Sequence, residues 1–374
     1  MIYLDSAATT FQKPKTVPAA MTAAMRTMGS PGRGGYPAAM AAAETAFTCR
    51  SALAELYHAD SPEQVVFTMN ATHGLNIAIK TLVPRGGRTV ISGYEHNAVT
   101  RPLRALEAET AVAAGPLFRP AETAEAFKQL IGPKTDAVIC CHVSNVFGFV
   151  LPVEEVAELC RRQGVPLIID ASQSAGVLPL DLKALGAAFI AMPGHKGLYG
   201  PQGTGVLLCG ADTKAATLLE GGTGSASIQQ EMPEFLPDRL EAGTHNMPGI
   251  AGLLEGVRYV RKRGEGAICR KERQLAQLAQ EGLRALPGVR VFGQPDLLAQ
   301  AGVVSFTAEG RDVESIGAGL AERGIAVRTG LHCAPTAHRT AGTLDSGTVR
   351  VSLSDFNTQE EIRAFLTAVK AILT

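Results

Sequence analysis

The 374-residue sequence contains no tryptophan, and aromatic side chains make up only 5% of it. This scarcity argues against a protein that binds single-stranded nucleic acid, because such proteins stack bases on aromatic rings. The sequence also lacks an excess of either charge, since 35 lysine and arginine residues balance 35 aspartate and glutamate residues. Because a polyanion-binding surface needs clustered positive charge, only a local basic patch stays open, and we expect no nucleic-acid partner.

Paired cysteines, membrane segments and a signal peptide are lacking too. The seven cysteines include no Cys-x-x-Cys pair, which argues against a zinc ribbon, and their odd number argues against a disulfide framework. The sequence has no run of about 18 apolar residues. Residues 1–11 lack the apolar core of a signal peptide. We therefore expect a cytoplasmic protein with reduced thiols, no membrane partner and no metal site.

Helix-like stretches alternate with short apolar runs between residues 37 and 210. The runs show no polar alternation, and strands of that kind are buried on both faces, which is typical of a parallel sheet covered by helices. The sequence therefore predicts an α/β fold with a mainly parallel sheet flanked by helices. The predicted strands cover residues 65–68, 88–92, 136–143, 165–169, 187–191 and 206–209, and the predicted helices cover 37–58, 70–82, 99–109 and 153–163.

The pattern changes toward the C-terminus. Residues 212–247 are rich in Gly, Pro and Ser and show no clear period, and a long helical pattern then covers residues 250–286. At about 150 residues per domain, the length favours two domains. We expect a large α/β domain over residues 15–255 and a smaller α+β domain over 256–374, with residues 1–14 packed against the small domain or the active site. The small domain's predicted strands cover 289–292, 303–306, 325–328 and 349–353, and its later helices cover 312–323 and 358–373.

Several residues with useful chemistry directly follow the predicted strands of the large domain. Ligands of open α/β sheets bind at the carboxyl ends of the strands, so these residues are candidates for one site. The helix predicted after Asn70 would offer free N–H groups to an anion, although a plain N-cap is an equal alternative. The residues at the strand ends are Asn70-Ala71-Thr72, Tyr94-Glu95-His96-Asn97, Ser144-Asn145, Asp170 and Lys196.

Together, these residue types match the needs of a pyridoxal phosphate site. A lysine bonds this cofactor, a carboxylate keeps its pyridine nitrogen protonated, a ring stacks on its face and backbone N–H groups hold its phosphate. Asp170 ends an apolar strand, where a carboxylate is costly unless it faces a cation. Each residue alone is a weak signal, and a lone histidine such as His96 is more often structural. Gly194-His195-Lys196 is not a P-loop, and Gly203-Thr204-Gly205 lacks the third glycine of a dinucleotide-binding motif.

Further motifs accompany these residues along nearly the whole chain. They are Tyr3-Leu4-Asp5-Ser6-Ala7-Ala8-Thr9-Thr10, Asp170-x-x-Gln173, Glu241-Ala242-Gly243-Thr244-His245-Asn246, Arg328-Thr329-Gly330-Leu331-His332-Cys333-Ala334, Arg350 and Asn357-Thr358. In this order, the motifs resemble those of cysteine desulfurases of the class V aminotransferase family, in the subgroup with a short loop around the catalytic cysteine. The resemblance implies a pyridoxal-phosphate-dependent enzyme of fold type I, and a homodimer whose sites are shared across the interface.

The resemblance also implies how the cofactor, pyridoxal 5′-phosphate, is held. Lys196 would bond it covalently, Asp170 would bind its pyridine nitrogen and Gln173 its phenolic oxygen. His96 would stack on the ring and shuttle protons. The phosphate ligands would be Ala71, Thr72 and His195, together with Thr244 from the other subunit.

The same resemblance implies the substrate and the reaction. Asn145, beside the cofactor, and Arg350 would hold the carboxylate of L-cysteine, with Arg328 and Arg33 also on the substrate side. Cys333 would attack the sulfur of the substrate. The products would be L-alanine and a persulfide on Cys333, which passes its sulfur to an acceptor protein.

Cys333 differs from the other cysteines in its sequence surroundings. Cys140 and Cys141 lie inside a predicted apolar strand, which is typical of small core residues. Cys333 instead lies in a polar, glycine-containing loop, with Arg328 and His338 nearby in the sequence. Because positive surroundings lower the pKa of a thiol and increase its thiolate fraction, we expect Cys333 to be the nucleophile.

Two positions depart from the family pattern, and several functions stay open. Pro193 stands where a serine or threonine commonly binds the phosphate, and Leu331 replaces a common histidine. Selenocysteine lyases, β-lyases, epimerases and transaminases would share the fold and most of these residues. A non-catalytic assembly partner would also keep the fold. The motifs do not define the sulfur acceptor or the pathway, be it iron–sulfur cluster assembly, thio-cofactor synthesis or selenium metabolism.

Overall fold

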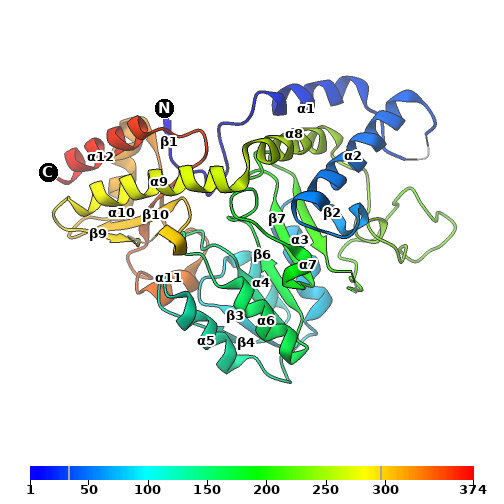
Figure 1. Ribbon diagram of the computed structural model, residues 1–374, viewed down its shortest axis with the longest axis horizontal. Helices are drawn as coiled ribbons and strands as arrows, with labels where there is room; N and C mark the ends of the chain where they lie inside the picture. The colour runs from blue at the N-terminus through cyan, green and yellow to red at the C-terminus, as the bar shows by residue number, and fades with distance from the viewer. Residues whose placement is uncertain (33, 212, 295–296) are drawn as a thin grey trace.

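The computed structural model of the chain describes residues 1–32, 34–211, 213–294 and 297–374. Seven of the described strands form one sheet in the order β2-β8-β7-β6-β5-β3-β4 (Figure 1). Neighbours from β4 to β7 run parallel, and β8 is antiparallel to both of its neighbours. The prediction of a mainly parallel sheet is therefore confirmed. The strands are β2 (Val65–Thr68), β3 (Arg88–Ser92), β4 (Glu109–Ala113), β5 (Ala137–Cys141), β6 (Leu167–Asp170), β7 (Phe189–Pro193) and β8 (Gly205–Cys209).

Helices cover both faces of this sheet. Successive strand residues point to opposite faces, so Ile139 and Ile168 pack with α3 and α4 while Val138 and Ile169 pack with helices that include α2 and α6. All four side chains are fully buried, which explains why the strands show no polar alternation. The helices around the sheet are α1 (Thr16–Thr27), α2 (Pro37–Leu56), α3 (Ala71–Leu82), α4 (Asn97–Ala105), α5 (Pro120–Leu130), α6 (Val153–Gln163), α7 (Leu182–Leu185) and α8 (Met247–Arg263).

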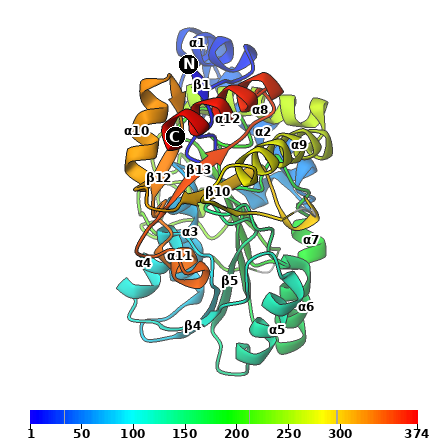
Figure 2. The ribbon, with the colours of Figure 1, turned by 90° about the vertical axis from the view of Figure 1, so that its left-hand side faces the viewer.

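A smaller antiparallel sheet, in the order β12-β13-β10-β9, lies beside the large one (Figure 2). Its apolar core is shared with α9, α10 and α12, whereas α11 packs on the core of the large sheet. The N-terminal strand pairs separately with β11. The elements are β1 (Ile2–Tyr3), β9 (Val289–Phe292), β10 (Val303–Ala308), β11 (Ile325–Ala326), β12 (Arg328–Gly330), β13 (Thr348–Ser352), α9 (Glu265–Arg284), α10 (Val313–Glu322), α11 (Pro335–Ala341) and α12 (Gln359–Leu373).

The structure corrects two predicted helices. The helix expected over residues 99–109 ends at Ala105, and residues 109–113 form the edge strand β4. Most of β4 is exposed, so it lacks the apolar run that marks the central strands. The helical pattern over 250–286 comprises two helices, α8 and α9, which are separated at Gly264 because its φ of +81° is outside the helical range. Helices α1, α5, α7 and α11 are additions to the predicted set.

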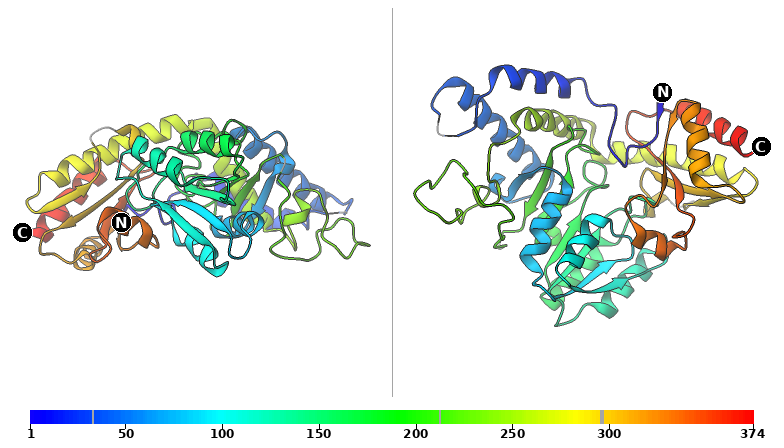
Figure 3. Two further views of the ribbon diagram at one scale, coloured as in Figure 1. Left: turned by 90° about the horizontal axis from the view of Figure 1, so that it is seen from below. Right: turned by 180° about the vertical axis from the view of Figure 1, so that it is seen from behind.

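The N-terminal segment joins the two parts of the molecule. It runs from β1, near α10 and α12, to α1, which packs against α8 (Figure 3). The expected domain boundary between residues 255 and 256 falls inside α8, which continues to Arg263, and the division into two domains stays a prediction. Among the described residues, none of the helices has the length and apolar content needed to cross a membrane.

Candidate active site

A cavity of about 190 Å³ lies at the carboxyl ends of the central strands. Strand pairing aligns Asp170 with Cys141 on one side and with Ala191 on the other, so β5 and β6 end at the same level and β7 continues to Pro193. The loop before α11 and one residue of β13 line the cavity from the smaller sheet. The cavity brings together the following predicted residues: Ala71, Thr72, His96, Asn145, Asp170, Gln173, His195, Lys196, Arg328, Cys333 and Arg350.

Lys196 follows β7, and Asp170 is the last residue of the neighbouring strand β6. Burial lowers the pKa of Lys196 to about 8, and the Asp170 carboxylate opposes this shift. One oxygen of Asp170 accepts hydrogen bonds from the backbone N–H of Ser172, at 2.9 Å, and from its hydroxyl group. Lys196 therefore loses its proton more readily than an exposed lysine, and Ser172 orients the carboxylate beside it.

His96 is the N-cap residue of α4. Its Nδ1 atom accepts a hydrogen bond from the backbone N–H of Ala98 at 3.0 Å, so the neutral ring carries its proton on Nε2. Burial is the main cause that lowers the pKa of His96, although the Asp170 carboxylate opposes it. The next residue, Asn97, donates its backbone N–H to the carbonyl oxygen of Cys333 at 2.8 Å. The start of α4, at His96 and Asn97, therefore holds the loop that carries Cys333.

The start of α3 forms one end of the cavity. Asn70 is its N-cap, and Asn70 Oδ1 accepts the backbone N–H of His73 at 2.9 Å. Ala71 and Thr72 belong to the first turn, whose N–H groups have no partner within the helix. Asn70 can therefore cap the helix while the N–H groups of Ala71 and Thr72 bind an anion, so the two interpretations do not exclude each other. His195 contacts Thr9 Oγ1 through Nδ1 at 3.0 Å, and burial lowers the pKa of His195 to about 4, so its ring is neutral.

Arg350 lies on β13 and is only 1% exposed. Its Nη1 atom donates to the carbonyl oxygen of Asn145 at 2.9 Å, and its Nη2 atom pairs with Asp5 Oδ1 at 2.6 Å. Asn145 in turn donates from Nδ2 to the carbonyl oxygen of His332 at 2.8 Å. One chain of hydrogen bonds thus leads from the N-terminal segment through the arginine to the residue before Cys333.

The loop around Cys333 confirms one prediction and corrects another. Cys333 is exposed, whereas the other six cysteines are buried, as expected for core thiols. His332 and Cys333 both have positive φ values, 48° and 57°, which are strained for residues other than glycine. Burial lowers the pKa of His338 to about 4, and that of His332 to about 2. The expectation that His338 adds positive charge near the thiol is therefore wrong, and the fixed positive charges of this cavity come from Arg328 and Arg350.

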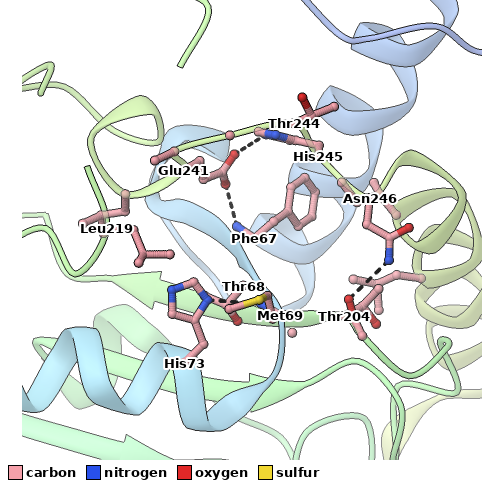
Figure 4. Close-up of a pocket in the computed structure, with 17 residues that line it drawn as sticks. Phe67, Thr68, Met69, His73, Thr204, Leu219, Glu241, Thr244, His245 and Asn246 are labelled. Carbon is pink, nitrogen blue, oxygen red and sulfur yellow. Dashed lines mark hydrogen bonds and ion pairs between the residues drawn. The ribbon is translucent and has the colours of Figure 1, made fainter. Parts of the chain in front are cut away.

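Two predicted residues lie outside this group. Arg33 is not among the described residues. Thr244 lines a second cavity of about 240 Å³ together with the exposed side chains of Met69 and Leu219 (Figure 4). Glu241, in the wall of that cavity, contacts His245 Nε2 at 2.5 Å and accepts the backbone N–H of Phe67 at 2.6 Å. A single chain therefore does not place Thr244 beside the other phosphate candidates.

The residues of the first cavity fit pyridoxal phosphate. A lysine with a lowered pKa lies near a buried carboxylate, and the first turn of α3 supplies unpaired N–H groups for a phosphate. Pro193 also lines this cavity but supplies no hydrogen-bond donor, so the phosphate depends on the remaining ligands. His96 and His195 are both neutral rings, which suits stacking and hydrogen bonding better than charge pairing.

This fold, with a lysine and a carboxylate at adjacent strand ends, is that of the pyridoxal-phosphate-dependent enzymes of fold type I. Residues 2–365 match the sequence pattern of the family described as aminotransferase class-V. The chain belongs to that family.

Proteins similar to this chain carry a consistent name. A relative from Mycolicibacterium paratuberculosis, named probable cysteine desulfurase, is 34% identical over the whole chain, which spans 55% of that relative. A relative of the same name from Pyrococcus abyssi is 31% identical, and the chain spans 94% of it. The apo structure of a cysteine desulfurase from Thermococcus onnurineus NA1 superposes with a TM-score of 0.89 at 31% identity, covering all of this chain and 94% of that one.

The sequence analysis did not assign a function to three residues at the site. Asp5 pairs with Arg350, Ser172 orients Asp170, and Glu95 is fully buried behind the cavity. Asp5 and Glu95 both occur inside motifs that the sequence marked, so a signal was present. What the motifs could not reveal was the partner of each carboxyl group, because Asp5 meets Arg350 across 345 positions of the chain.

Proposed function

We propose that this enzyme is a cysteine desulfurase, which converts L-cysteine to L-alanine and transfers the sulfur to Cys333 as a persulfide. One observation carries the proposal: Cys333 is exposed at the cavity that also contains Lys196, Asp170 and Arg350. A transaminase or epimerase needs the lysine and the carboxylate but no thiol. The names of the relatives support the same choice.

The cofactor in this proposal is pyridoxal 5′-phosphate. When bound, it withdraws electrons from the substrate and so weakens the bonds around the α-carbon. Lys196 would bond it, while Asp170 would pair with its pyridine nitrogen and Gln173 with its phenolic oxygen. His96 would stack on the ring. The phosphate would be held by Ala71, Thr72 and His195, and Asn145 would lie between cofactor and substrate.

The residues of this chain would then divide the chemistry among them. Arg350 and Asn145 would bind the substrate carboxylate, with Arg328 and Arg33 on the same side. Lys196, whose pKa is about 8, would accept the proton from the α-carbon. The Cys333 thiolate would form a bond with the substrate sulfur as the bond between that sulfur and the β-carbon of the substrate breaks. The β-carbon would then take a proton. The products are alanine and the persulfide.

The partners of the enzyme are part of the same proposal. A homodimer would bring Thr244 of one subunit to the phosphate site of the other, since Thr244 lies in a separate cavity of its own chain. The exposed apolar side chains of Met69 and Leu219 in that cavity support a protein contact there. The persulfide would pass to a sulfur-acceptor protein in the cytoplasm.

Mass spectrometry after brief exposure to L-cysteine tests the proposal. The cofactor-loaded protein should release alanine and gain the mass of one sulfur on the peptide that contains Cys333. The Cys333→Ala variant should keep the visible absorption of the cofactor but lose sulfide release, while Cys160→Ala, at a buried cysteine of α6, serves as the matched control. Sulfide release by Cys333→Ala at the wild-type rate would show that Cys333 is not the nucleophile. A preference for another amino acid in a parallel panel would favour a lyase, epimerase or transaminase.

A further inference from the structure

The N-terminal residues 2–10 are built into the active site by backbone hydrogen bonds. Asp5 pairs with Ser352 at the end of β13, and Ala7 donates its backbone N–H to Ser352 Oγ at 2.8 Å. Further along, Thr10 donates its backbone N–H to the carbonyl oxygen of His195 at 3.1 Å. The position of the segment therefore depends on its backbone rather than on the Asp5 side chain.

This pairing places the Asp5 carboxylate beside Arg350. Arg350 and Ser352 are two positions apart on one strand, so their side chains lie on the same face, next to Asp5. Asp5 Oδ1 lies 2.6 Å from Arg350 Nη2. An enclosed guanidinium group needs a counter-charge, and Asp5 is the acidic partner that the described residues provide.

The remaining donors of Arg350 are only partly used. Nη1 donates to the Asn145 carbonyl oxygen at 2.9 Å, which gives the guanidinium group a second partner besides Asp5. Nε is buried and has no hydrogen-bond partner among the described residues. The arginine therefore keeps a free donor for another carboxylate while it is still paired with Asp5. A carboxylate that binds there meets a like charge across the same guanidinium group.

The other charges around Asp5 also indicate that its carboxylate opposes the binding of an anion. The Asp5 carboxylate is close enough to Lys196 to raise the lysine's pKa, and Arg328 and Arg350 are close enough to lower it. Lys196, Arg328 and Arg350 thus line the cavity with the carboxylate of Asp170, while the Asp5 carboxylate pairs with Arg350. Removing the charge of Asp5 would increase the excess of positive charge around the cavity and would strengthen the binding of any anion.

We propose that Asp5 is a specificity-determining residue that shares Arg350 with the carboxylate of the amino acid. It holds the guanidinium group in place when the site is empty of amino acid, and it weakens the binding of the carboxylate so that the product can leave. This inference rests on the proposed function insofar as Arg350 is taken to bind the substrate carboxylate. Asp5 itself transfers no proton and forms no bond in the reaction.

Calorimetric titration of the cofactor-loaded Asp5→Asn variant with L-alanine tests this inference. The amide oxygen keeps a hydrogen-bond acceptor for Arg350 but removes the charge, so we expect the Kd of L-alanine to fall about tenfold, the effect of one like charge in a partly buried site. Cysteamine, which has the amine and thiol but no carboxylate, should bind both proteins equally. Asp60→Asn, which removes a surface carboxylate paired with Lys183, is the matched control and should leave both affinities unchanged.

Asp5→Glu provides a second variant that keeps the charge, and its Kd for L-alanine should stay within about threefold of the wild-type value. An unchanged or weaker affinity for L-alanine in Asp5→Asn would overturn the inference, as would an equal gain for cysteamine. Binding of L-alanine requires no turnover. Failure to release sulfide from L-cysteine would therefore refute the proposed function without deciding the role of Asp5.

Discussion

Glu95 offers a direct test of the electrostatics behind the active site. Its side chain is fully buried, and Oε1 accepts hydrogen bonds from the Cys141 backbone N–H, at 2.7 Å, and from the Ser92 hydroxyl. Oε2 is also buried and has no hydrogen-bond partner among the described residues. Burial is the main cause that raises the pKa of Glu95 to about 8, and the charge of Asp170 adds to the effect. The group is therefore protonated in the folded protein at neutral pH.

The direction of the pH effect follows from proton counting. The unfolded chain loses this proton near the ordinary glutamate pKa of about 4.3, whereas the folded chain keeps it up to a pKa of about 8. Between these values the folded state binds more protons, so the free energy of unfolding falls as the pH rises, and it levels off above the folded pKa. At about 1.4 kcal/mol for each pH unit, the loss has an upper limit of roughly 5 kcal/mol.

The Glu95→Gln variant should remove this pH dependence. Glutamine keeps an oxygen that can accept the hydrogen bonds from Cys141 and Ser92, but it cannot ionise. We expect the stability of the variant relative to wild type to increase by about 3 to 5 kcal/mol between pH 5 and pH 8.5. The comparison cancels other titrating groups, including Glu272, whose pKa burial also raises to about 8.

Urea unfolding of both full-length proteins at several pH values measures the difference. Glu55→Gln, at an exposed carboxylate that pairs with Arg261, is the matched control and should show no such trend. A stability difference between Glu95→Gln and wild type that stays constant from pH 5 to pH 8.5 would refute the reasoning. A difference that shrinks with rising pH would show that Glu95 is ionised in the folded protein.

Three further predictions test the packing and the thiols. Gly256→Ala should lower stability by about 3 kcal/mol in urea unfolding, because the added methyl group would collide with the Leu198 carbonyl oxygen. A gain in stability, which is the usual result of replacing a helical glycine by alanine, would contradict the packing of α8. Arg50→Met should cost about 3 kcal/mol because it removes the arginine partner of the buried Glu241 carboxylate, which then keeps only His245 as a side-chain partner, and the double variant with Glu241→Leu should recover stability; a double variant no better than the single one would argue against the pair. Iodoacetamide should label Cys333 in the native protein well before any buried cysteine, and peptide mapping that finds equal labelling would contradict the exposure.

The sequence predicted most strands of the large sheet because the signal for each strand lies within a few consecutive residues. Residues 65–68 and 88–92 were expected as strands and form β2 and β3 with the same bounds, since most side chains of each are buried and each has β-branched residues at its centre or start. The edge strand β4 was not predicted because most of its positions are exposed, so its sequence lacks a continuous apolar run. The interruption at Gly264 was missed for a similar reason, as one glycine hardly changes the periodicity of a long helical pattern.

The candidate site was predictable in its residues but not in its contacts. A carboxylate and a lysine at strand ends mark a ligand site, because a parallel sheet brings strand ends to one edge. Whether a histidine is charged depends on its burial, and the sequence near Cys333 gave no measure of it: His338 is buried and neutral. Thr244 likewise lies in its own cavity, although its motif resembles a phosphate-binding segment.

Local composition and order by themselves indicated the α/β fold class, the position of the strand-end residues and the polar surroundings that distinguish Cys333 from the cysteines in apolar strands. Those features depend on side-chain type and on spacing along the chain, which the sequence contains in full. Only the tertiary structure decided which charges meet. Asp5 reaches Arg350 because the N-terminal segment pairs beside β13, and Glu95 stays protonated because the surrounding strands exclude water from it. Both effects depend on distance and burial in space, which no local pattern encodes.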